Sequence, residues 1–133
     1  MGITEMEEVP TVQDLIRAAE EIQGSFELGD GFSAGAVGAA LRTKSGNIYT
    51  GICIELACGI GFCAEHSAVA EMLKHRETEI EAIVAVSPEG IIPPCGRCRE
   101  LLAQVSAANL NTRVLLDRDE VVLLRDLLPH RWY

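Results

Sequence analysis

Two segments of this sequence decide its fold and its chemistry: Cys63-Ala64-Glu65 and Pro94-Cys95-Gly96-Arg97-Cys98. Together they supply three thiolates, which are ligands that tetrahedral zinc prefers, and a carboxylate just after the first of them. A structural zinc site takes four protein ligands, whereas three ligands and a nearby proton carrier leave a position at which the metal can activate water. A lone CxxC motif is as typical of redox or structural zinc sites. The pair of segments therefore predicts a catalytic site for one Zn²⁺ per chain, with Cys63, Cys95 and Cys98 as ligands and Glu65 as the general acid–base.

Each of these segments is expected to begin a helix. Cys63 can begin one that runs through about Lys74, and Cys95 one that runs to about Ala107. Both N-termini would then point at the metal, where each helix dipole stabilises a thiolate by roughly 0.3–1 kcal/mol. Such support matters because three thiolates around Zn²⁺ leave the site with a negative charge. Arg97 or Arg99 could also donate a hydrogen bond to a ligand sulfur. For each of these arginines, a position on a solvent-exposed helix face without any contact to the metal site is an equal alternative.

The remaining hydrophobic patterns alternate between helix and strand. Thr11 can cap a helix through about Gln23, and the apolar run Ala82–Val86 suits a strand buried on both faces. Four further strands are expected, the first two forming a hairpin around the turn Ser45-Gly46-Asn47: Val37–Arg42, Ile48–Ile54, Arg113–Leu116 and Val121–Leu124. This order predicts an α/β protein, a three-layer α/β/α fold with a mixed five-stranded sheet. We expect one domain over residues 1–133, with residues 1–10 flexible.

Composition and charge agree with one small catalytic domain. The chain has 133 residues, of which 48% are hydrophobic, enough for a single core. The net charge of −9 would repel a phosphate backbone, so a free small molecule is a better expected substrate than a nucleic acid polymer. No apolar run approaches the roughly 18 residues of a membrane span, and the acidic start lacks the basic region of a signal peptide. The odd number of cysteines, five, favours a reducing, cytoplasmic location.

Seven short motifs occur in one order from about residue 32 to the C-terminus: Val37-Gly38-Ala39-Ala40-Leu41, Thr43-Lys44-Ser45-Gly46, Thr50-Gly51, Ile54-Glu55, Cys63-Ala64-Glu65, Pro94-Cys95-Gly96-Arg97-Cys98-Arg99 and Leu127-Leu128-Pro129-His130-Arg131-Trp132. In residues and order they resemble the cytidine deaminase family of zinc-dependent nucleoside deaminases. Within the family the chain looks most like the blasticidin S deaminase branch. The features behind this are the run Arg42-Thr43-Lys44, the run Arg99-Glu100-Leu101 and the lack of the usual ribose-binding asparagine.

The resemblance implies hydrolysis of the cytosine amino group of a free nucleoside or analogue, such as cytidine, deoxycytidine or blasticidin S, with release of ammonia. Glu65 would carry protons from water to the ring and to the leaving group. Glu55 keeps the family's sugar-binding acceptor, while Cys53 stands where the family has asparagine. Phe32 could supply an aromatic face that the family places elsewhere. The implied fold is the cytidine deaminase-like one, and the implied assembly is a homotetramer in which Trp132 covers the base in a neighbouring subunit's pocket.

Plainer interpretations stay open for several of these residues and for the function. Cys53 could be a small buried hydrophobe, Phe32 simple loop packing, and Trp132 a side chain packed on its own subunit. A structural zinc module that binds a partner protein is disfavoured by the missing fourth ligand, and an inert family member by the intact Glu65. A deaminase of a free base or of a polynucleotide is disfavoured by Glu55 and by the acidic charge respectively.

Overall fold

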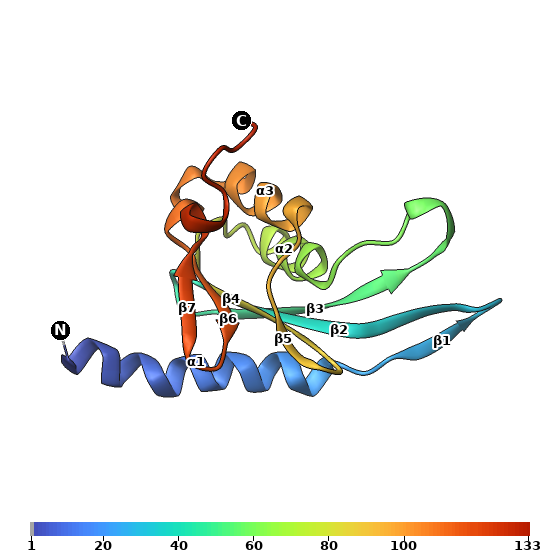
Figure 1. Cartoon of the computed structure of the whole chain (residues 1–133), viewed down its shortest axis with the longest axis horizontal. Helices are drawn as coiled ribbons and strands as arrows, with labels where there is room; N and C mark the ends of the chain where they lie inside the picture. The colour runs from blue at the N-terminus through green and yellow to red at the C-terminus, as the bar shows by residue number, and fades with distance from the viewer. Residues whose placement is uncertain (1) are drawn as a thin grey trace.

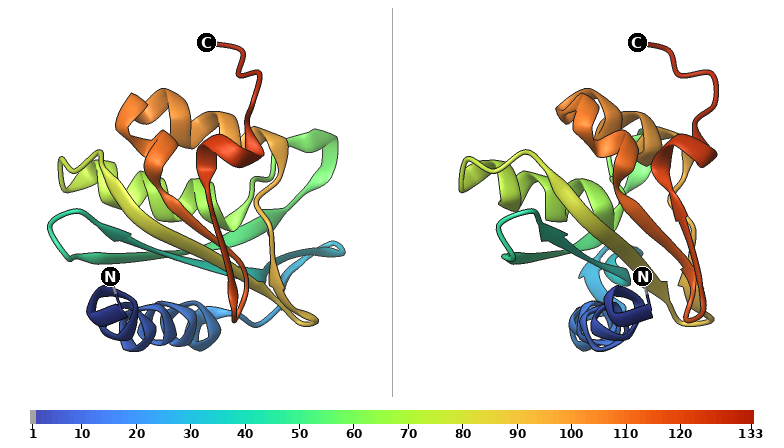
Figure 2. Two further views of the ribbon diagram at one scale, coloured as in Figure 1. Left: turned by 60° about the vertical axis from the view of Figure 1, so that its left-hand side comes forward. Right: turned by 90° about the vertical axis from the view of Figure 1, so that its left-hand side faces the viewer.

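The computed structural model describes residues 12–133 in full and, for residues 2–11, the helical backbone alone. A seven-stranded sheet has α1 on one face and α2 and α3 on the other (Figures 1 and 2). This confirms the expected three-layer α/β/α architecture. The prediction that residues 1–10 are flexible falls outside the fully described residues. The elements follow in the order α1 (Gly2–Ile22), β1 (Phe26–Gly29), β2 (Phe32–Thr43), β3 (Ile48–Glu55), η1 (Ala57–Gly59), α2 (Ala64–Lys74), β4 (Ile80–Ser87), β5 (Gly90–Ile92), α3 (Gly96–Val105), η2 (Ala107–Asn111), β6 (Arg113–Asp117), β7 (Glu120–Leu123) and η3 (Leu124–Leu127).

The sheet is mixed, as expected, but larger than predicted. Its strand order is β1-β2-β4-β6-β7, with β3 paired to the other edge of β2 and β5 paired to β4. The pairing of β4 with β6 is parallel and the other pairings are antiparallel. The prediction of five strands is therefore wrong, because it omits β1 and β5. Both are short: the four residues of β1 are exposed, and the three of β5 run into Pro93 and Pro94.

The five predicted strands and three predicted helices all occur, with shifts at their ends. The largest shifts are at two starts: α1 begins at Gly2 rather than at Thr11, and β2 begins at Phe32 rather than at Val37. The hairpin of β2 and β3 is confirmed. None of the described helices is both long enough and apolar enough to cross a membrane.

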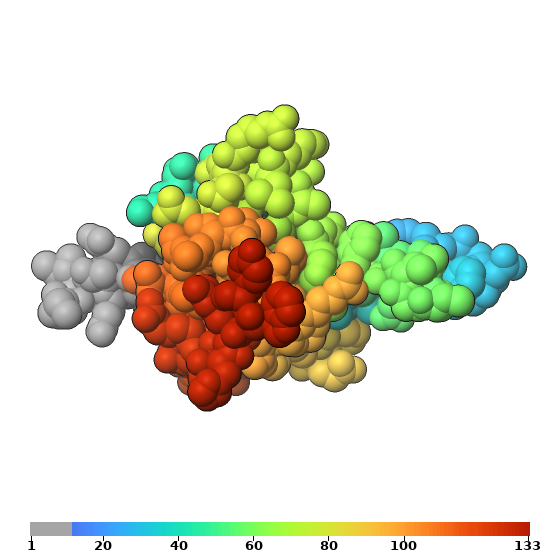
Figure 3. Space-filling view, turned by 90° about the horizontal axis from the view of Figure 1, so that it is seen from above, coloured from blue at the N-terminus to red at the C-terminus, as the bar shows by residue number. Residues whose placement is uncertain are grey.

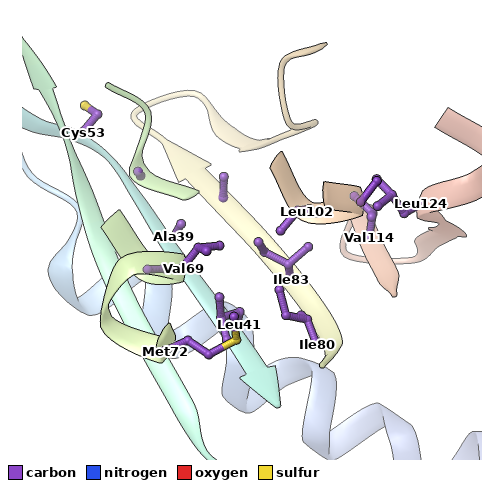
Figure 4. Close-up of a cluster of buried hydrophobic side chains, with 14 residues drawn as sticks. Ala39, Leu41, Cys53, Val69, Met72, Ile80, Ile83, Leu102, Val114 and Leu124 are labelled. Carbon is purple, nitrogen blue, oxygen red and sulfur yellow. The ribbon is translucent and has the colours of Figure 1, made fainter. Parts of the chain in front are cut away.

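Two hydrophobic cores lie on opposite faces of the sheet. Alternation along β2 turns Ala40 towards α1 and its neighbours Ala39 and Leu41 towards α2. The α1 side is packed by buried residues that include Leu15, Ile16, Ala19, Val84 and Leu115. The α2 and α3 side contains the larger cluster, part of which Figure 4 labels: Val69, Met72, Ile80, Ile83, Leu102, Val114 and Leu124. This second core fixes the two helices whose N-termini carry the cysteine motifs.

Helix α2 rests directly on the backbone of β3 at Gly51. A Cβ atom at Gly51 would lie 2.4 Å from the backbone nitrogen of Ala68 and 2.5 Å from the Cβ atom of Ser67. No side chain fits there. The absence of a side chain therefore allows the first half of α2, which follows Cys63, to lie close to the sheet.

A buried asparagine supports the end of α3 and the start of β4. Asn109, fully buried in η2, accepts a hydrogen bond from the backbone N–H of Ile80 at 2.8 Å. Its amide nitrogen donates to the carbonyl oxygens of Thr78 and Leu102, both at 3.0 Å. One side chain thereby satisfies three backbone groups from two parts of the chain, the start of β4 and the end of α3.

Replacing this asparagine should destabilise the fold strongly. In Asn109→Leu the three backbone groups lose their partner, at about 1–3 kcal/mol for each group that stays buried and unsatisfied. We expect the free energy of unfolding to fall by about 4 kcal/mol, near the upper end for single substitutions. Urea denaturation followed by circular dichroism measures this. The matched control is Asn111→Leu, an exposed position in the same turn; equal losses in both variants would contradict the role given to Asn109.

Candidate active site

The two cysteine motifs meet at the N-termini of α2 and α3. Cys63 is the N-cap residue of α2 and Cys95 that of α3, and neither cap position shows a side-chain capping bond. Cys98 lies in the first turn of α3 and is fully buried. Free N–H groups and the positive ends of both helix dipoles therefore face the sulfur atoms, as the sequence predicted.

The sulfur positions fit a single zinc ion. The Sγ atoms of Cys63 and Cys95 are 3.6 Å apart, and those of Cys95 and Cys98 are 3.5 Å apart. A tetrahedral ion with Zn–S bonds of about 2.3 Å would place its sulfur ligands about 3.8 Å from one another. The described cysteines are free of disulfides. The donor set of three thiols at one tetrahedral face therefore fits one Zn²⁺.

A histidine that the sequence reading did not select also lies at this cluster. The Nδ1 atom of His66 is 3.5 Å from the Sγ atom of Cys98. The ligand atoms of Cys63, His66 and Cys98 all lie within 4.8 Å of one another. Burial lowers the pKa of His66, and the nearby positive charge of Arg97 lowers it further. His66 is one residue from Glu65, but a single histidine on a helix carries no spacing signal of its own.

In the absence of metal, the environment favours the protonated form of two of the three thiols, those of Cys63 and Cys98. Burial raises the pKa of Cys98 and of Cys63, and the Glu65 carboxylate raises both further. Burial acts in the same direction on Cys95, but hydrogen bonds from the backbone N–H groups of Cys98 and Arg97, among others, outweigh it and lower its pKa. Metal binding at this site must therefore release protons and grow stronger as pH rises.

Glu65 lies in the first turn of α2 with only 4% of its surface exposed. Burial raises the pKa of its carboxyl group, while hydrogen bonds from its own backbone N–H and from the Cys98 thiol act to lower it. A carboxyl group with a raised pKa accepts a proton more readily near neutral pH. Its position therefore suits a group that takes up and returns protons beside the three sulfur atoms.

A cavity of about 460 Å³ opens at this cluster. Cys63, Cys95 and Glu65 form part of its lining, and Glu55 and Arg97 are its other charged residues. Most of the rest of the wall is apolar, with contributions from Val37, Ile54, Leu56, Phe62, Ile92 and Pro93. A mostly apolar pocket with a few polar groups is typical of a small-molecule site.

Of the four predicted substrate-binding residues, the structure brings two to the cavity. Cys53 and Glu55 line it. Phe32 is half-buried at the start of β2 and is not among the residues that line the cavity of its own chain, so its role towards substrate stays a prediction. Trp132 is 83% exposed near the C-terminus, also away from the cavity of its own chain. Its predicted role concerns a neighbouring subunit and stays a prediction.

Cys53 has a structural partner as well as a place in the cavity wall. The β2–β3 ladder pairs Ala34 with Ile54 and next Gly38 with Ile52, so Cys53 alone faces a bulge of β2. Within this bulge the backbone N–H of Val37 donates a hydrogen bond to the Cys53 sulfur at 3.3 Å. Cys53 is 6% exposed. The interpretation as a small buried residue therefore accounts for much of its environment.

Phe62 is the aromatic residue of the cavity that the sequence reading missed. An isolated bridge pairs it with Ile54 through two backbone hydrogen bonds of 3.0 Å, which closes the loop between them. The neighbouring Gly61 allows this approach, because a Cβ atom there would lie 2.0 Å from the carbonyl oxygen of Ile54. The sequence contains one indication that Phe62 lies near the metal site, because this phenylalanine stands between a glycine and the first cysteine ligand.

The two arginines proposed to support the thiolates have different surroundings. Arg99 donates hydrogen bonds to the carbonyl oxygens of Pro94, at 2.8 Å, and Leu127, at 3.1 Å. These bonds tie the start of α3 to the C-terminal segment. Arg97 is exposed and lines the cavity. The sulfur contact that the structure records from a nitrogen side chain comes instead from His66.

Comparison with known proteins places this arrangement in a family. The family model described as "Cytidine and deoxycytidylate deaminase zinc-binding region" matches residues 11–113. A cytidine deaminase of Halalkalibacterium halodurans is 36% identical over 105 residues, which cover 74% of this chain and 77% of that protein. A blasticidin-S deaminase of Bacillus cereus is 38% identical over 77 residues, covering 50% of this chain and 55% of that protein.

The solved structures that resemble this chain are cytidine deaminases as well. The crystal structure of cytidine deaminase from Mycobacterium leprae superimposes with a TM-score of 0.74 and 27% identity, covering 89% of this chain and 97% of that one. The cytidine deaminase of Burkholderia pseudomallei gives a TM-score of 0.72 and 30% identity, covering 90% and 98%. The family match spans both cysteine motifs and Glu65. This chain therefore belongs to the cytidine and deoxycytidylate deaminase family.

Proposed function

We propose that this protein is a zinc-dependent hydrolase that deaminates the cytosine ring of a free nucleoside or nucleoside analogue. The observation that carries the proposal is the position of the Glu65 carboxyl group, which is buried at the cavity beside the three-cysteine cluster. A structural zinc site has no use for a buried carboxyl group that is not a ligand, whereas hydrolysis of an amino group needs one.

The protein side of the reaction follows from this placement. Bound zinc supplies a Lewis acid that lowers the pKa of a water molecule towards roughly 7. Glu65 would take the proton of that water as its oxygen forms a bond to C4 of the ring, and would pass the proton to ring atom N3. Glu65 would next take the remaining proton from the hydroxyl group on C4 and pass it to the amino group as the C4–N bond breaks, which releases ammonia and leaves the uracil form. Ring and water must meet at the end of the cavity lined by Cys63, Cys95 and Glu65.

The cavity and the charge of the chain support a free nucleoside as the substrate. Glu55 lines the cavity and offers an acceptor for sugar hydroxyl groups, while the apolar wall, including Phe62, suits the faces of a base. The net charge of −9 opposes binding of a polynucleotide. Cytidine, deoxycytidine and blasticidin S are the candidate substrates. The replacement of the family's asparagine by Cys53 favours the blasticidin S deaminase branch.

A substrate panel tests the proposal. Purified protein is assayed for zinc content and for ammonia release from cytidine, deoxycytidine, cytosine and blasticidin S, with kcat/KM determined for each active compound. We expect about one zinc per chain and the highest kcat/KM on a compound that carries a sugar. Preference for free cytosine would overturn the nucleoside assignment. Zinc-replete protein that releases no ammonia from any of the four would support the alternative of a structural zinc module.

We also propose a homotetramer in which subunits complete one another's pockets. The C-terminal segment stands out from the body of the molecule (Figure 1) and lies on the face seen in Figure 3. It ends in two stacked aromatic side chains, Trp132 and Tyr133, that are 83% and 80% exposed. An exposed aromatic pair gains most by docking on another surface, and a second copy of this chain is the occupant that the family resemblance implies.

Deletion of residues 130–133 tests this assembly. If Trp132 covers the substrate of a neighbouring subunit, the truncated protein should show a KM raised by roughly tenfold or more, since a lost stacking contact is worth about 0.5–1.5 kcal/mol beyond burial. Zinc content should not change, because the metal site lies in α2 and α3. Light scattering of the intact protein should give four chains. A fully active monomer, or an unchanged KM after truncation, would contradict the shared pocket.

A cytoplasmic location completes the proposal. The described cysteines are all free, and three of them must stay reduced to bind zinc. The reducing cytoplasm provides this condition. Fractionation of cells that express the tagged protein tests the location, and recovery with secreted material would contradict it.

A further inference from the structure

His66 is the one nitrogen side chain that the structure places against a sulfur of the cysteine cluster, among the contacts of the described residues. We propose that His66 is a positioning residue, which donates an Nδ1–H hydrogen bond to the Cys98 thiolate from outside the coordination shell of the metal. The inference rests on the zinc site of the proposed function. It assigns to His66 the role that the sequence reading gave to Arg97 or Arg99.

The geometry argues against His66 as a fourth ligand. In a tetrahedral site the fourth donor atom would lie about 3.5 Å from each of the three sulfur atoms. Among the contacts of the described residues, His66 reaches this distance to Cys98, and none is recorded from it to Cys63 or Cys95. The set of ligand atoms that lie within 4.8 Å of one another contains Cys63, His66 and Cys98 but not Cys95, although the Cys95 sulfur is 3.6 Å and 3.5 Å from the other two sulfurs. The recorded contacts therefore place the imidazole at the Cys98 sulfur and give it no contact with the Cys95 sulfur.

The cavity leads to the same conclusion. Cys63, Cys95 and Glu65 line it, whereas His66 is not among its lining residues. The face of the sulfur triangle that opens to substrate is thus left free, and His66 approaches the cluster from another direction. A fourth position that opens into the cavity is what a hydrolytic site requires.

The Cys98 sulfur is also the ligand with the greatest need of a donor. It is fully buried, and the Glu65 carboxyl group lies beside it. The guanidinium of Arg99 is directed to two backbone carbonyl oxygens. A buried thiolate without a hydrogen bond would be strongly disfavoured, and a contact of 3.5 Å from the His66 ring nitrogen supplies one. A neutral imidazole does so without adding a positive charge.

Two substitutions at His66 separate the two possible roles. His66→Asn places an amide N–H near the position of Nδ1 and keeps a hydrogen-bond donor, but it is a poor zinc ligand. His66→Leu removes both functions. His75→Asn is the matched control, because His75 is a second histidine of the same helical segment, directed to Glu71 and away from the cluster. All proteins are first checked for folding by circular dichroism.

The readout is metal binding and not turnover. The apoproteins are titrated with Co²⁺, whose thiolate charge-transfer bands report on the sulfur ligands and whose visible bands report on the number of ligands. Zinc affinity is measured by competition with a chelator. We expect His66→Leu to weaken zinc binding about 10–100-fold and to shift the charge-transfer bands, with visible bands of unchanged intensity. His66→Asn should recover most of both effects, and His75→Asn should match the wild type.

Two results would overturn the proposal. If His66→Asn fails like His66→Leu and both lose visible-band intensity, His66 is a ligand. If His66→Leu binds zinc and Co²⁺ as the wild type does, His66 does not support Cys98. Failure of the proposed function is a separate outcome, since it would appear as wild-type protein that binds metal but releases no ammonia from the substrate panel.

Discussion

Glu65→Gln protein should keep its fold and its zinc while its turnover falls by at least about 10²–10⁴-fold, the range ascribed to general acid–base catalysis. Glutamine has nearly the same size and can fill the buried site of Glu65, but it cannot accept and return a proton. The loss should appear in kcat, because both proton transfers belong to the chemical steps. Steady-state kinetics on the best substrate of the panel, together with metal analysis, measures both expectations.

The control for this variant is Glu71→Gln. Glu71 is a glutamate of the same helix that forms an ion pair with Lys74, contacts the ring nitrogen of His75 and is not among the residues that line the cavity. It should leave kcat within about twofold, as expected for a surface substitution. Near-normal turnover in Glu65→Gln would remove the carboxyl group from the mechanism. Loss of zinc in that variant would instead make Glu65 part of the metal site.

Cys95→Ala should abolish zinc binding and, with it, measurable deamination. Only Cys63 and Cys98 would remain of the three ligands, and two thiolates do not define a stable tetrahedral site. Because the ligands join the starts of α2 and α3, the variant should also unfold at a lower temperature than the zinc-loaded wild type. Metal analysis and a thermal melt, each with and without added zinc, test the two expectations.

Cys58→Ala is the matched control, because Cys58 is an exposed cysteine in η1 that contributes no sulfur to the cluster. It should retain one zinc per chain and the melting temperature of the wild type. Removal of zinc from the wild type with a chelator should reproduce the Cys95→Ala phenotype. Full zinc occupancy in Cys95→Ala would show that His66 or another group can replace the Cys95 sulfur.

The sequence predicted the parts of the site whose signals are local. The spacing of Cys95 and Cys98 and the position of Glu65 two residues after Cys63 are fixed along the chain, and a helix that begins at each motif brings these groups to one place. The layer order followed from alternating strand and helix patterns in the same way. Buried strands with continuous apolar runs, such as β4, left little ambiguity.

Features that depend on distant contacts could not be predicted in this way. His66 contacts a sulfur atom of another helix, and Phe62 is paired with Ile54 by an isolated bridge. The exposed strand β1 and the very short β5 have too few buried residues for a periodic signal. The aromatic ring of Phe32 favours a substrate contact on sequence grounds, but Phe32 is not among the residues that line the cavity of its own chain, which depends on how the chain folds around β2.

The contact of Gly51 with α2 has a consequence for the alignment of the metal site. Cys63 and Glu65 belong to the segment that rests on this glycine, while Cys95 and Cys98 belong to α3, which does not. A single methyl group at Gly51 would lift one half of the ligand set relative to the other. The position of Cys63 and Glu65 relative to Cys95 and Cys98 therefore depends on Gly51, which is neither a ligand nor part of the cavity lining. Any redesign of this protein must treat that glycine as part of the geometry of the site.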